Sequence, residues 1–430
     1  MIQEIKIKNF LSFKEEVTFS FEATKDTFAD DYQVVEVAKG VRLLRFAMIY
    51  GANASGKSNL LTVFNFLHHF WFYKPDDIDE EIGVIPFKLD KITTNEPSSF
   101  ELIFYVNSTK YWYQLELDEK QVYTEKLFYY KTVQPTLLFH RELINDQSVI
   151  NFNSAAVKVS SVVKEKISVE CLKNMSFFAA RDKVNATIPE IDVAKDWLKK
   201  QIMPVVSPRT KMFQYAEKQM LENKDIKSYL LDFVRAADFN IVDINTQIEK
   251  KEIPQKVVDY FMNNPETTEQ EKEKLKKDRF VSTPKTSFMH TVSNERGEEI
   301  YSLPENLQSE GTKRIFGLEA AIYNAIQDNC FLFIDEVETS LHPQLLRFVL
   351  LNFLRKESSR SQLLITTHYD PLLNDIDEIF RKDSVWFTEK TKSGHTDVYS
   401  LTDFKGLNRL SSIQKAYNYG KFGAYPEIDL

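Results

Sequence analysis

The sequence predicts an α/β fold that combines a parallel sheet with an antiparallel meander and a mainly helical insertion. Three observations lead to this prediction. A nearly continuous apolar run at residues 43–50 precedes a glycine-bearing turn and then apolar residues at helical spacing. Two further apolar runs, at 330–334 and 361–366, end in polar residues, as strands buried on both faces of a parallel sheet do. Aromatic segments within residues 100–142 carry shorter alternating patterns that predict antiparallel strands.

Composition limits the class of protein. The chain has 430 residues, 43% of them hydrophobic and 27% charged, which is ordinary for a globular protein of one to three domains. Cys171 and Cys330 lie far apart, so we expect neither a disulfide framework nor a zinc site. The start "MIQEIKIKNF" is not a signal peptide, and no run of 18 apolar residues exists. We therefore expect a cytoplasmic protein without a membrane segment. The net charge of −8 argues against attraction of nucleic acid to the whole surface, although it does not exclude a local basic groove.

The first part of the chain predicts a hairpin, a strand–turn–helix unit and a meander. Residues 1–25 alternate isoleucine or aromatic residues with polar ones on both sides of the turn "NFLSF". The run 43–50 is expected to be one buried strand. The meander strands are expected at 100–106, 110–117, 121–130 and 136–142.

The pattern becomes helical from about residue 190, and strands are expected at 239–248, in "SFMHTVSN" and in "EEIYSLP". The charge run "EQEKEKLKKDR" (269–279) has alternating signs, which favours a solvated helix face over a nucleic-acid-binding arm. After it the α/β pattern returns, and "DSVWF" and "DVYSL" read as strands that close the sheet. We predict a first lobe at 1–190, a mainly helical insertion at 191–285 and a second lobe at 286–430.

The turn after the first buried strand has the pattern G-x-x-x-x-G-K-S, from Gly51 to Ser58. This pattern can arise by chance, but strand, glycine turn and helix together aim backbone N–H groups at a phosphate. Lys57 would reach the β- and γ-phosphates, and the Ser58 hydroxyl would hold Mg²⁺. The predicted ATP-binding residues are Gly51, Asn53, Ala54, Ser55, Gly56, Lys57, Ser58 and Asn59.

Acidic residues end the apolar run at 330–334. Asp335 is expected to coordinate Mg²⁺, and Glu336 to take a proton from the attacking water. His368 follows the next strand, where its side chain could reach the γ-phosphate. A lone histidine at a strand end is more often structural, but its place about 30 residues beyond Asp335 favours a catalytic role.

A second helix N-terminus lies in "LQSEGTKRIFGLEAAIYNAI" (307–326). Ile315, Leu318 and Ile322 mark an amphipathic helix that begins near Gly311, with Ser309 as its N-cap. An ordinary cap is the alternative reading. The position just before the acidic strand favours a ligand-binding role for Ser309, Glu310 and Gly311.

Taken in order, these pieces resemble an ABC-type ATPase head: phosphate loop, signature helix, acidic strand and switch histidine. The resemblance implies a P-loop NTPase fold in which two heads dimerise face to face, with ATP and Mg²⁺ between them. Ser309, Glu310 and Gly311 would then act in trans, on the nucleotide held by the partner.

The details separate the chain from transporter cassettes. Its signature reads SEGTK rather than LSGGQ, and about 250 residues separate Ser58 from Ser309. The opening "IKIKNFLSFKEEVTFSF" resembles SMC, RecF and OLD-type heads. The chain is most similar to the AAA15-type "ATP-binding protein" family, through "YGANASGKSNLL", "SEGTKR", "FIDEVETSLHP", "TTHYDPLL" and "YGKFGAYP". Two features depart from the pattern: no glutamine stands in "VIPFKLDK" (84–91), and no long heptad run exists.

The family resemblance implies an ATPase of bacterial anti-phage defence. Its partner would be a separately encoded effector, a nuclease or a toxin, and its trigger a phage protein or nucleic acid. A DNA-repair or DNA-maintenance ATPase of the RecF/SMC kind, binding DNA directly, is the alternative. Only 62 residues follow His368, too few for a Toprim nuclease domain of roughly 100 residues, so we expect no nuclease activity from this chain alone.

Overall fold

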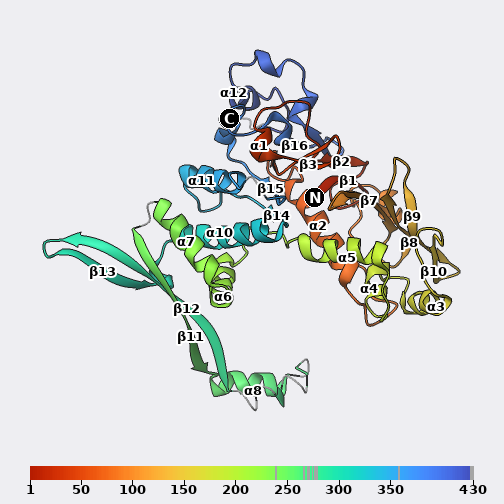
Figure 1. The fold of residues 1–430 in the computed structure, drawn as a ribbon, viewed down its shortest axis with the longest axis horizontal. Coiled ribbons are helices and arrows are strands. Elements are labelled where there is room, and N and C mark those ends of the chain that lie inside the picture. Colours follow the sequence, from red (N-terminus) through yellow and green to blue (C-terminus); the bar gives the residue numbers. More distant parts are fainter. Residues whose placement is uncertain are drawn as a thin grey trace. The chain divides into compact units, whose positions relative to one another are not determined.

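The computed structural model describes residues 1–237, 240–264, 267–268, 272–273, 275, 279–356 and 359–426. These residues form two compact units, drawn in Figure 1. Unit 1 comprises Met1–Pro208, Asn324–Thr339 and Val349–Leu430, and unit 2 comprises Arg209–Tyr323 and Ser340–Phe348. The three-part division of the sequence stays a prediction, because compact units and functional lobes need not coincide.

Unit 1 contains the expected parallel sheet, with strand order β14-β15-β5-β16-β17. The first four strands run parallel, and β17 closes the sheet antiparallel to β16. All five residues of β5 are buried, as the apolar run predicted. The strands are β5 (Phe46–Tyr50), β14 (Phe331–Ile334), β15 (Gln362–Thr366), β16 (Val385–Lys390) and β17 (Thr396–Ser400). The predicted α/β fold class is confirmed.

The antiparallel sheet of unit 1 has seven strands in the order β10-β9-β8-β7-β6-β1-β2. The N-terminal hairpin and the meander are therefore one sheet, because β1 pairs with β6 with Ile5 opposite Leu102. The sequence predicted the two parts separately and missed their pairing as well as β10. The strands are β1 (Ile2–Lys8), β2 (Val17–Ser20), β6 (Ser98–Val106), β7 (Thr109–Leu117), β8 (Val122–Tyr130), β9 (Thr136–Ile144) and β10 (Gln147–Phe152).

The run 43–50 forms two strands, which corrects the prediction of one. β4 (Val41–Leu44) pairs with β3 (Val34–Ala38) in a separate two-stranded sheet, and β5 begins at Phe46. The break falls at Arg45, whose fully buried guanidinium donates to the carbonyl oxygens of Tyr32 at 3.0 Å and Leu354 at 3.2 Å. Burial lowers the pKa of Arg45 to about 10.

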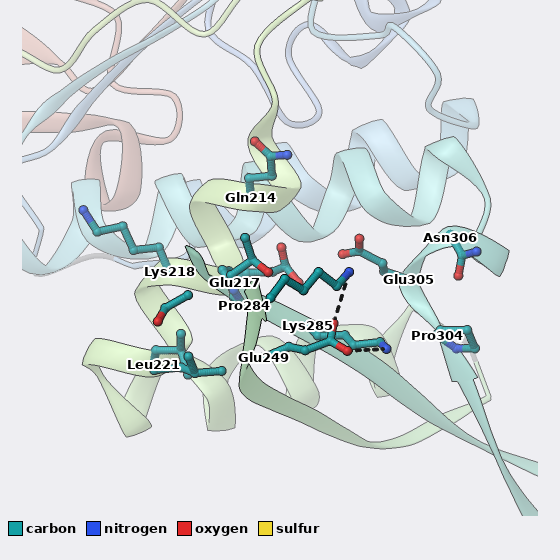
Figure 2. Close-up of a pocket in the computed structure, with 14 residues that line it drawn as sticks. Gln214, Glu217, Lys218, Leu221, Glu249, Pro284, Lys285, Pro304, Glu305 and Asn306 are labelled. Carbon is teal, nitrogen blue, oxygen red and sulfur yellow. Dashed lines mark hydrogen bonds and ion pairs between the residues drawn. The ribbon is translucent and has the colours of Figure 1, made fainter. Parts of the chain in front are cut away.

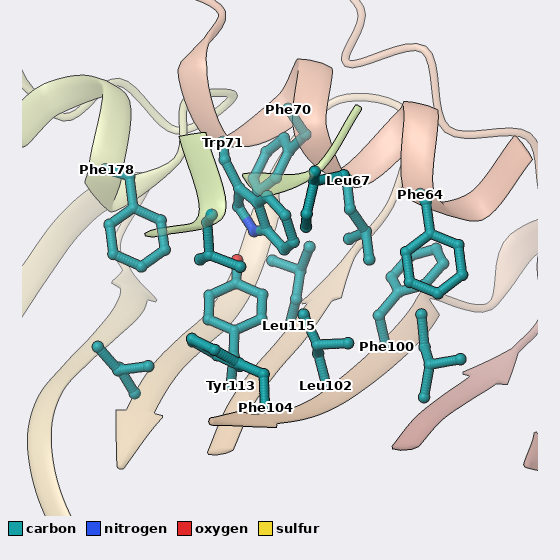
Figure 3. Close-up of a cluster of buried hydrophobic side chains, with 14 of the residues drawn as sticks. Phe64, Leu67, Phe70, Trp71, Phe100, Leu102, Phe104, Tyr113, Leu115 and Phe178 are labelled. Atoms are coloured by element: carbon teal, nitrogen blue, oxygen red, sulfur yellow. The ribbon is translucent and has the colours of Figure 1, made fainter. Parts of the chain in front are cut away.

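Helix α2 (Lys57–Phe72) lies in the core of unit 1 and contacts both of its large sheets. Phe64 packs on Phe333 of the parallel sheet, with ring centroids 4.6 Å apart. Trp71 meets Tyr113 of the antiparallel sheet edge-on at 5.5 Å, as Figure 3 shows. Because α2 begins directly after the phosphate loop, this packing on two sides holds the loop in place.

The remaining helices of unit 1 are short. Residues 370–375 form a 3-10 helix. The remaining α-helices and 3-10 helices (η) of unit 1 are α1 (Asp30–Gln33), η1 (Thr93–Asn95), α3 (Ser161–Glu170), α4 (Phe177–Arg181), α5 (Pro189–Gln201), η3 (Asp370–Asp375), η4 (Lys382–Ser384), η5 (Leu401–Asp403), η6 (Leu407–Arg409) and α12 (Ile413–Asn418).

Unit 2 combines helices with a three-stranded antiparallel sheet of order β11-β12-β13. In Figure 1, β11 and β12 form a long hairpin that leads to α8, and this hairpin is longer than the sequence predicted. The charge run 269–279 lies largely outside the described residues. The elements are α6 (Met212–Glu222), α7 (Lys224–Ala236), β11 (Ile241–Glu252), α8 (Gln255–Asn263), β12 (Phe280–Asn294), β13 (Gly297–Pro304) and η2 (Glu305–Leu307). Two more helices, α10 (Glu310–Asp328) and α11 (Pro343–Leu354), contain residues of both units.

Candidate nucleotide-binding site

The loop between β5 and α2 adopts a conformation suited to anion binding. Ala54 has φ 61° and Gly56 has φ 106°, so left-handed residues alternate with ordinary ones. In anion-binding loops this alternation turns successive N–H groups inward. A Cβ added at Gly51 would lie 2.5 Å from the carbonyl oxygen of Thr388, so this position requires glycine. Ser55 Oγ lies 2.7 Å from Thr388 Oγ1, which ties the loop to β16. Asn53 and Ala54 are exposed at the outside of the loop.

Lys57 lies buried beneath this loop, with 5% of its surface exposed. Its ammonium donates to the carbonyl oxygens of Gly51 at 2.8 Å and Ala52 at 3.1 Å. Burial lowers the pKa of Lys57 to about 8, and the nearby Asp335 and Glu336 carboxylates oppose this shift. The cation is thus held by the loop's own carbonyl groups, and its contact with phosphate stays a prediction.

A chain of hydrogen bonds joins the loop to the acidic pair. Ser58 Oγ donates to Asp335 Oδ1 at 3.0 Å, although 277 residues separate them. Thr366, at the end of β15, donates its hydroxyl to the same oxygen at 2.6 Å. The Thr366 hydroxyl also accepts the backbone N–H of Glu336 at 2.8 Å. One threonine therefore orients both acidic residues, and sequence reasoning missed it because threonine is common at strand ends.

Glu336 has a strained backbone. Its φ of 46° lies in the left-handed region, which is unusual for a residue with a long side chain. The hydrogen bond from its N–H to Thr366 and the bond from the Thr339 N–H to its carbonyl, 3.0 Å long, hold this conformation. The strain turns the chain directly at the end of β14, and such outliers gather at functional sites.

His368 stands at the same end of the parallel sheet. Its backbone N–H donates to Glu338 Oε1 at 2.7 Å. Burial lowers the pKa of the His368 imidazole, and the Lys57 ammonium lowers it further. The lowered pKa favours the neutral imidazole near pH 7, and a contact of His368 with the γ-phosphate stays a prediction.

The oxygen atoms at this edge fit a magnesium ion. Mg²⁺ prefers oxygen ligands and usually takes one or two from protein side chains and the rest from phosphate and water. Ser58 Oγ and Asp335 Oδ1, 3.0 Å apart, supply such a pair. Among the residues that the structure describes, no three His, Cys, Asp or Glu side chains converge as a metal site, so a fully protein-bound metal is not supported there.

Two side chains near the loop, Ser12 and Thr396, were not predicted. Ser12, in the turn after β1, accepts hydrogen bonds from Asn59 Nδ2 and Thr396 Oγ1, each at 2.8 Å. Thr396 Oγ1 also lies 2.8 Å from the Ser55 carbonyl oxygen. A Cβ at Gly56 would lie 2.8 Å from Ser12 Oγ. The turn "NFLSF" and β17 therefore hold the loop from both ends of the chain.

The predicted signature residues lie in unit 2. Ser309 caps α10, since its hydroxyl accepts the Thr312 N–H at 3.0 Å. Glu310 is exposed and pairs with Lys313 at 2.5 Å. A Cβ at Gly311 would lie 2.7 Å from the Ser340 carbonyl oxygen, so the glycine permits a close backbone approach. The capped, exposed helix start agrees with the sequence, and its role in trans stays a prediction.

Comparisons with solved structures find weak likenesses. The head domain of SMC from Thermotoga maritima has a TM-score of 0.41 and 14% identity, over 93% of this chain and 98% of that one. The structure titled "SmcHead bound to the C-winged helix domain of ScpA" has a TM-score of 0.43 and 13% identity, over 96% and 99%. Neither likeness is strong enough to bear on function. No curated protein matches the chain, and no helix of the described residues could cross a membrane.

A family profile described as "AAA domain, putative AbiEii toxin, Type IV TA system" matches residues 46–157 and 195–374, well over half of the chain. The matched ranges contain the phosphate loop, the signature segment, the acidic pair and His368. The description names an AAA domain, which agrees with the predicted P-loop ATPase class. The chain therefore belongs to the family of AAA domains described as putative AbiEii toxins of type IV toxin–antitoxin systems.

Proposed function

We propose that the protein binds ATP with Mg²⁺ and hydrolyses it to ADP and phosphate. The observation that carries this proposal is the hydrogen-bonded chain from Ser58 through Asp335 and Thr366 to Glu336. It links the phosphate loop to a metal-binding carboxylate and to a second carboxylate within one network, as ATP hydrolysis requires.

Each group has a definite task in this proposal. Lys57 and the inward-facing N–H groups of the loop bind the β- and γ-phosphates. Ser58 and Asp335 hold Mg²⁺, which neutralises phosphate charge when bound. Glu336 accepts a proton from the water that attacks, and His368, neutral near pH 7, hydrogen-bonds to the γ-phosphate.

We infer that two copies act together. Ser309, Glu310 and Gly311 form an exposed helix start that suits an anion, and the resemblance to ABC-type heads supports its use in trans on the partner's nucleotide. ATP would then lie between the two protomers of a homodimer, and hydrolysis would separate them.

The biological role that we propose is control of a separately encoded effector, a nuclease or toxin, in bacterial anti-phage defence. The family description, which names a putative toxin of a type IV toxin–antitoxin system, supports a link to such a system. The separate effector rests on the resemblance described above. The trigger would be a phage protein or nucleic acid. The chain alone is expected to cut neither plasmid DNA nor tRNA with Mg²⁺ or Mn²⁺, and cleavage lost on neutralising a carboxylate outside the Asp335–Glu336 pair would contradict this.

Phosphate release from ATP tests the enzymatic part. Asp335→Asn should abolish the Mg²⁺-dependent rate, because the amide cannot replace the anionic ligand. Asp76→Asn, the same change at an exposed position after α2, is the matched control and should leave the rate unchanged. A wild-type protein that releases no phosphate, alone or with candidate triggers, would overturn the proposed hydrolysis. So would an Asp335→Asn variant with the full rate.

A further inference from the structure

A cavity within unit 2 contains two acidic side chains with unsatisfied oxygen atoms. It has a volume of about 900 Å³ and is lined mainly by residues of α6, β11, β12 and η2. Figure 2 draws the side chains that line it. Glu217 enters it from α6 with only 2% of its surface exposed, and Glu305 enters from η2. In the described part of the chain, neither the buried Oε1 of Glu217 nor the buried Oε2 of Glu305 has a hydrogen-bond partner. When neither carboxyl carries a proton, these oxygens lack a donor, which is unfavourable and leaves room for a donor from outside the chain.

The lysines around the cavity do not supply that donor. Lys251 and Lys285 both pair with Glu249, at 3.3 and 3.5 Å. Lys218 pairs with Glu222 on its own helix, at 3.9 Å. Two lysines that share one carboxylate leave positive charge at the rim, whereas the carboxyl groups of Glu217 and Glu305 leave the interior acidic.

The pKa of the Glu217 carboxyl group indicates that its surroundings disfavour the charged form. Burial raises the pKa of Glu217 to about 7, and a hydrogen bond from Thr286 opposes the rise. The Glu305 carboxylate adds to the rise, both because the protonated Glu217 donates a hydrogen bond to it and because its charge repels a second negative charge. The charged groups that face it are Lys218 of α6, Glu249 and Lys251 of β11, Lys285 of β12 and Glu305 of η2. An entering cation would favour the charged carboxylate and so lower this pKa.

We propose that this cavity receives an arginine side chain of a partner protein, with its guanidinium between Glu217 and Glu305. A guanidinium presents several N–H donors in one plane and can serve two carboxylates at once. A metal ion fits less well, because no third His, Cys, Asp or Glu converges on the pair among the described residues. The cavity exceeds a bare guanidinium in size, and its rim carries uncompensated lysine charge. We therefore expect acidic residues on both sides of the arginine in the partner protein, because their charge matches the lysine charge at the rim. This proposal does not depend on ATP hydrolysis.

Calorimetric titration of the full chain with three capped tripeptides tests the chemistry. The peptides are Asp-Arg-Asp, Asp-Lys-Asp and Lys-Arg-Lys. Asp-Arg-Asp should bind at least about tenfold more tightly than the other two, because only it matches both the interior and the rim. Its affinity should fall up to about tenfold from pH 8 to pH 6, because Glu217, with its pKa of about 7, becomes protonated. Equal binding of the lysine peptide, or competition by MgCl₂ alone, would overturn the proposal.

Variants show whether binding occurs in this cavity. Glu217→Gln keeps the shape and removes the charge, so Asp-Arg-Asp should bind at least about tenfold more weakly and lose its pH dependence. Asp232→Asn, the same loss of charge at an exposed position of α7 outside the cavity, should bind like the wild type. Melting temperatures check folding, and Glu305→Gln replaces Glu217→Gln if the latter does not fold. Undetectable binding of Asp-Arg-Asp to the wild type, or unchanged binding to the charge-neutral variant, would contradict the proposal.

Discussion

Replacement of Lys57 by methionine separates the function of this lysine from its effect on stability. Methionine matches the length of the side chain but carries no charge, so it fills the same buried space beneath the loop. An ammonium about 4 Å from a phosphate charge contributes about 4 kcal/mol at an effective dielectric constant of about 20. We therefore expect Lys57→Met to bind ATP about 10³-fold more weakly.

The stability of the nucleotide-free protein should not fall in parallel. Lowering the pKa of Lys57 from 10.5 to about 8 corresponds to about 3 kcal/mol of unfavourable burial at pH 7. This penalty is complete below pH 8 and disappears above pH 10.5, because the folded protein loses the proton first. The variant also loses two hydrogen bonds to the carbonyl groups of Gly51 and Ala52, each worth about 1 kcal/mol. The free energy of unfolding should therefore stay level or rise by about 1 kcal/mol.

Two measurements check this pair of expectations: titration with a fluorescent ATP analogue and urea unfolding at pH 7. Lys74→Met, the same change at an exposed position just after α2, is the control and should alter neither. In the wild type, ATP affinity should fall about tenfold per pH unit above pH 8, because the free protein then loses the Lys57 proton. ATP affinity within a few-fold of wild type would remove Lys57 from phosphate binding. A loss of more than about 2 kcal/mol of stability would show that its contacts with the loop carbonyls dominate instead.

Three further variants test the rest of the site. Glu336→Gln should keep ATP binding but slow single-turnover hydrolysis by about 10²–10⁴-fold, and near-normal turnover would mean that another group activates the water. Thr366→Val removes the hydroxyl that donates to Asp335 and accepts from the Glu336 N–H. It should weaken activation by Mg²⁺ by about 10- to 100-fold while metal-free ATP binding stays unchanged, and an unaltered Mg²⁺ titration would deny the threonine its positioning role. Ser309→Arg should bind ATP yet fail to hydrolyse it, and its mixture with Lys57→Ala should regain at most one working site per dimer. Wild-type hydrolysis by monomeric Ser309→Arg would refute the face-to-face arrangement.

The sequence by itself determined the loop, the buried strands of the parallel sheet and the cap of α10. These features are local. Gly51 and Gly56 are needed where a Cβ would collide or φ is positive, and Ser309 caps the helix that follows it directly. Apolar runs indicate burial residue by residue, so the sequence predicted β5. It did not predict the residue at which β5 begins. The buried Arg45 that ends β4 looks, in the sequence, like one charge within an apolar run.

Only the tertiary structure decided which polar side chains meet. Thr366, Ser12 and Thr396 lie on separate strands and turns, and their hydroxyl groups reach the site because the packing of two sheets brings those segments together. The pairing of β1 with β6 and the approach of Glu217 to Glu305 depend on contacts between residues far apart in the chain. The sequence pattern around a short polar side chain does not indicate which group it will hydrogen-bond to. Its hydrogen bond depends on fractions of an ångström, and folding of the whole chain decides these.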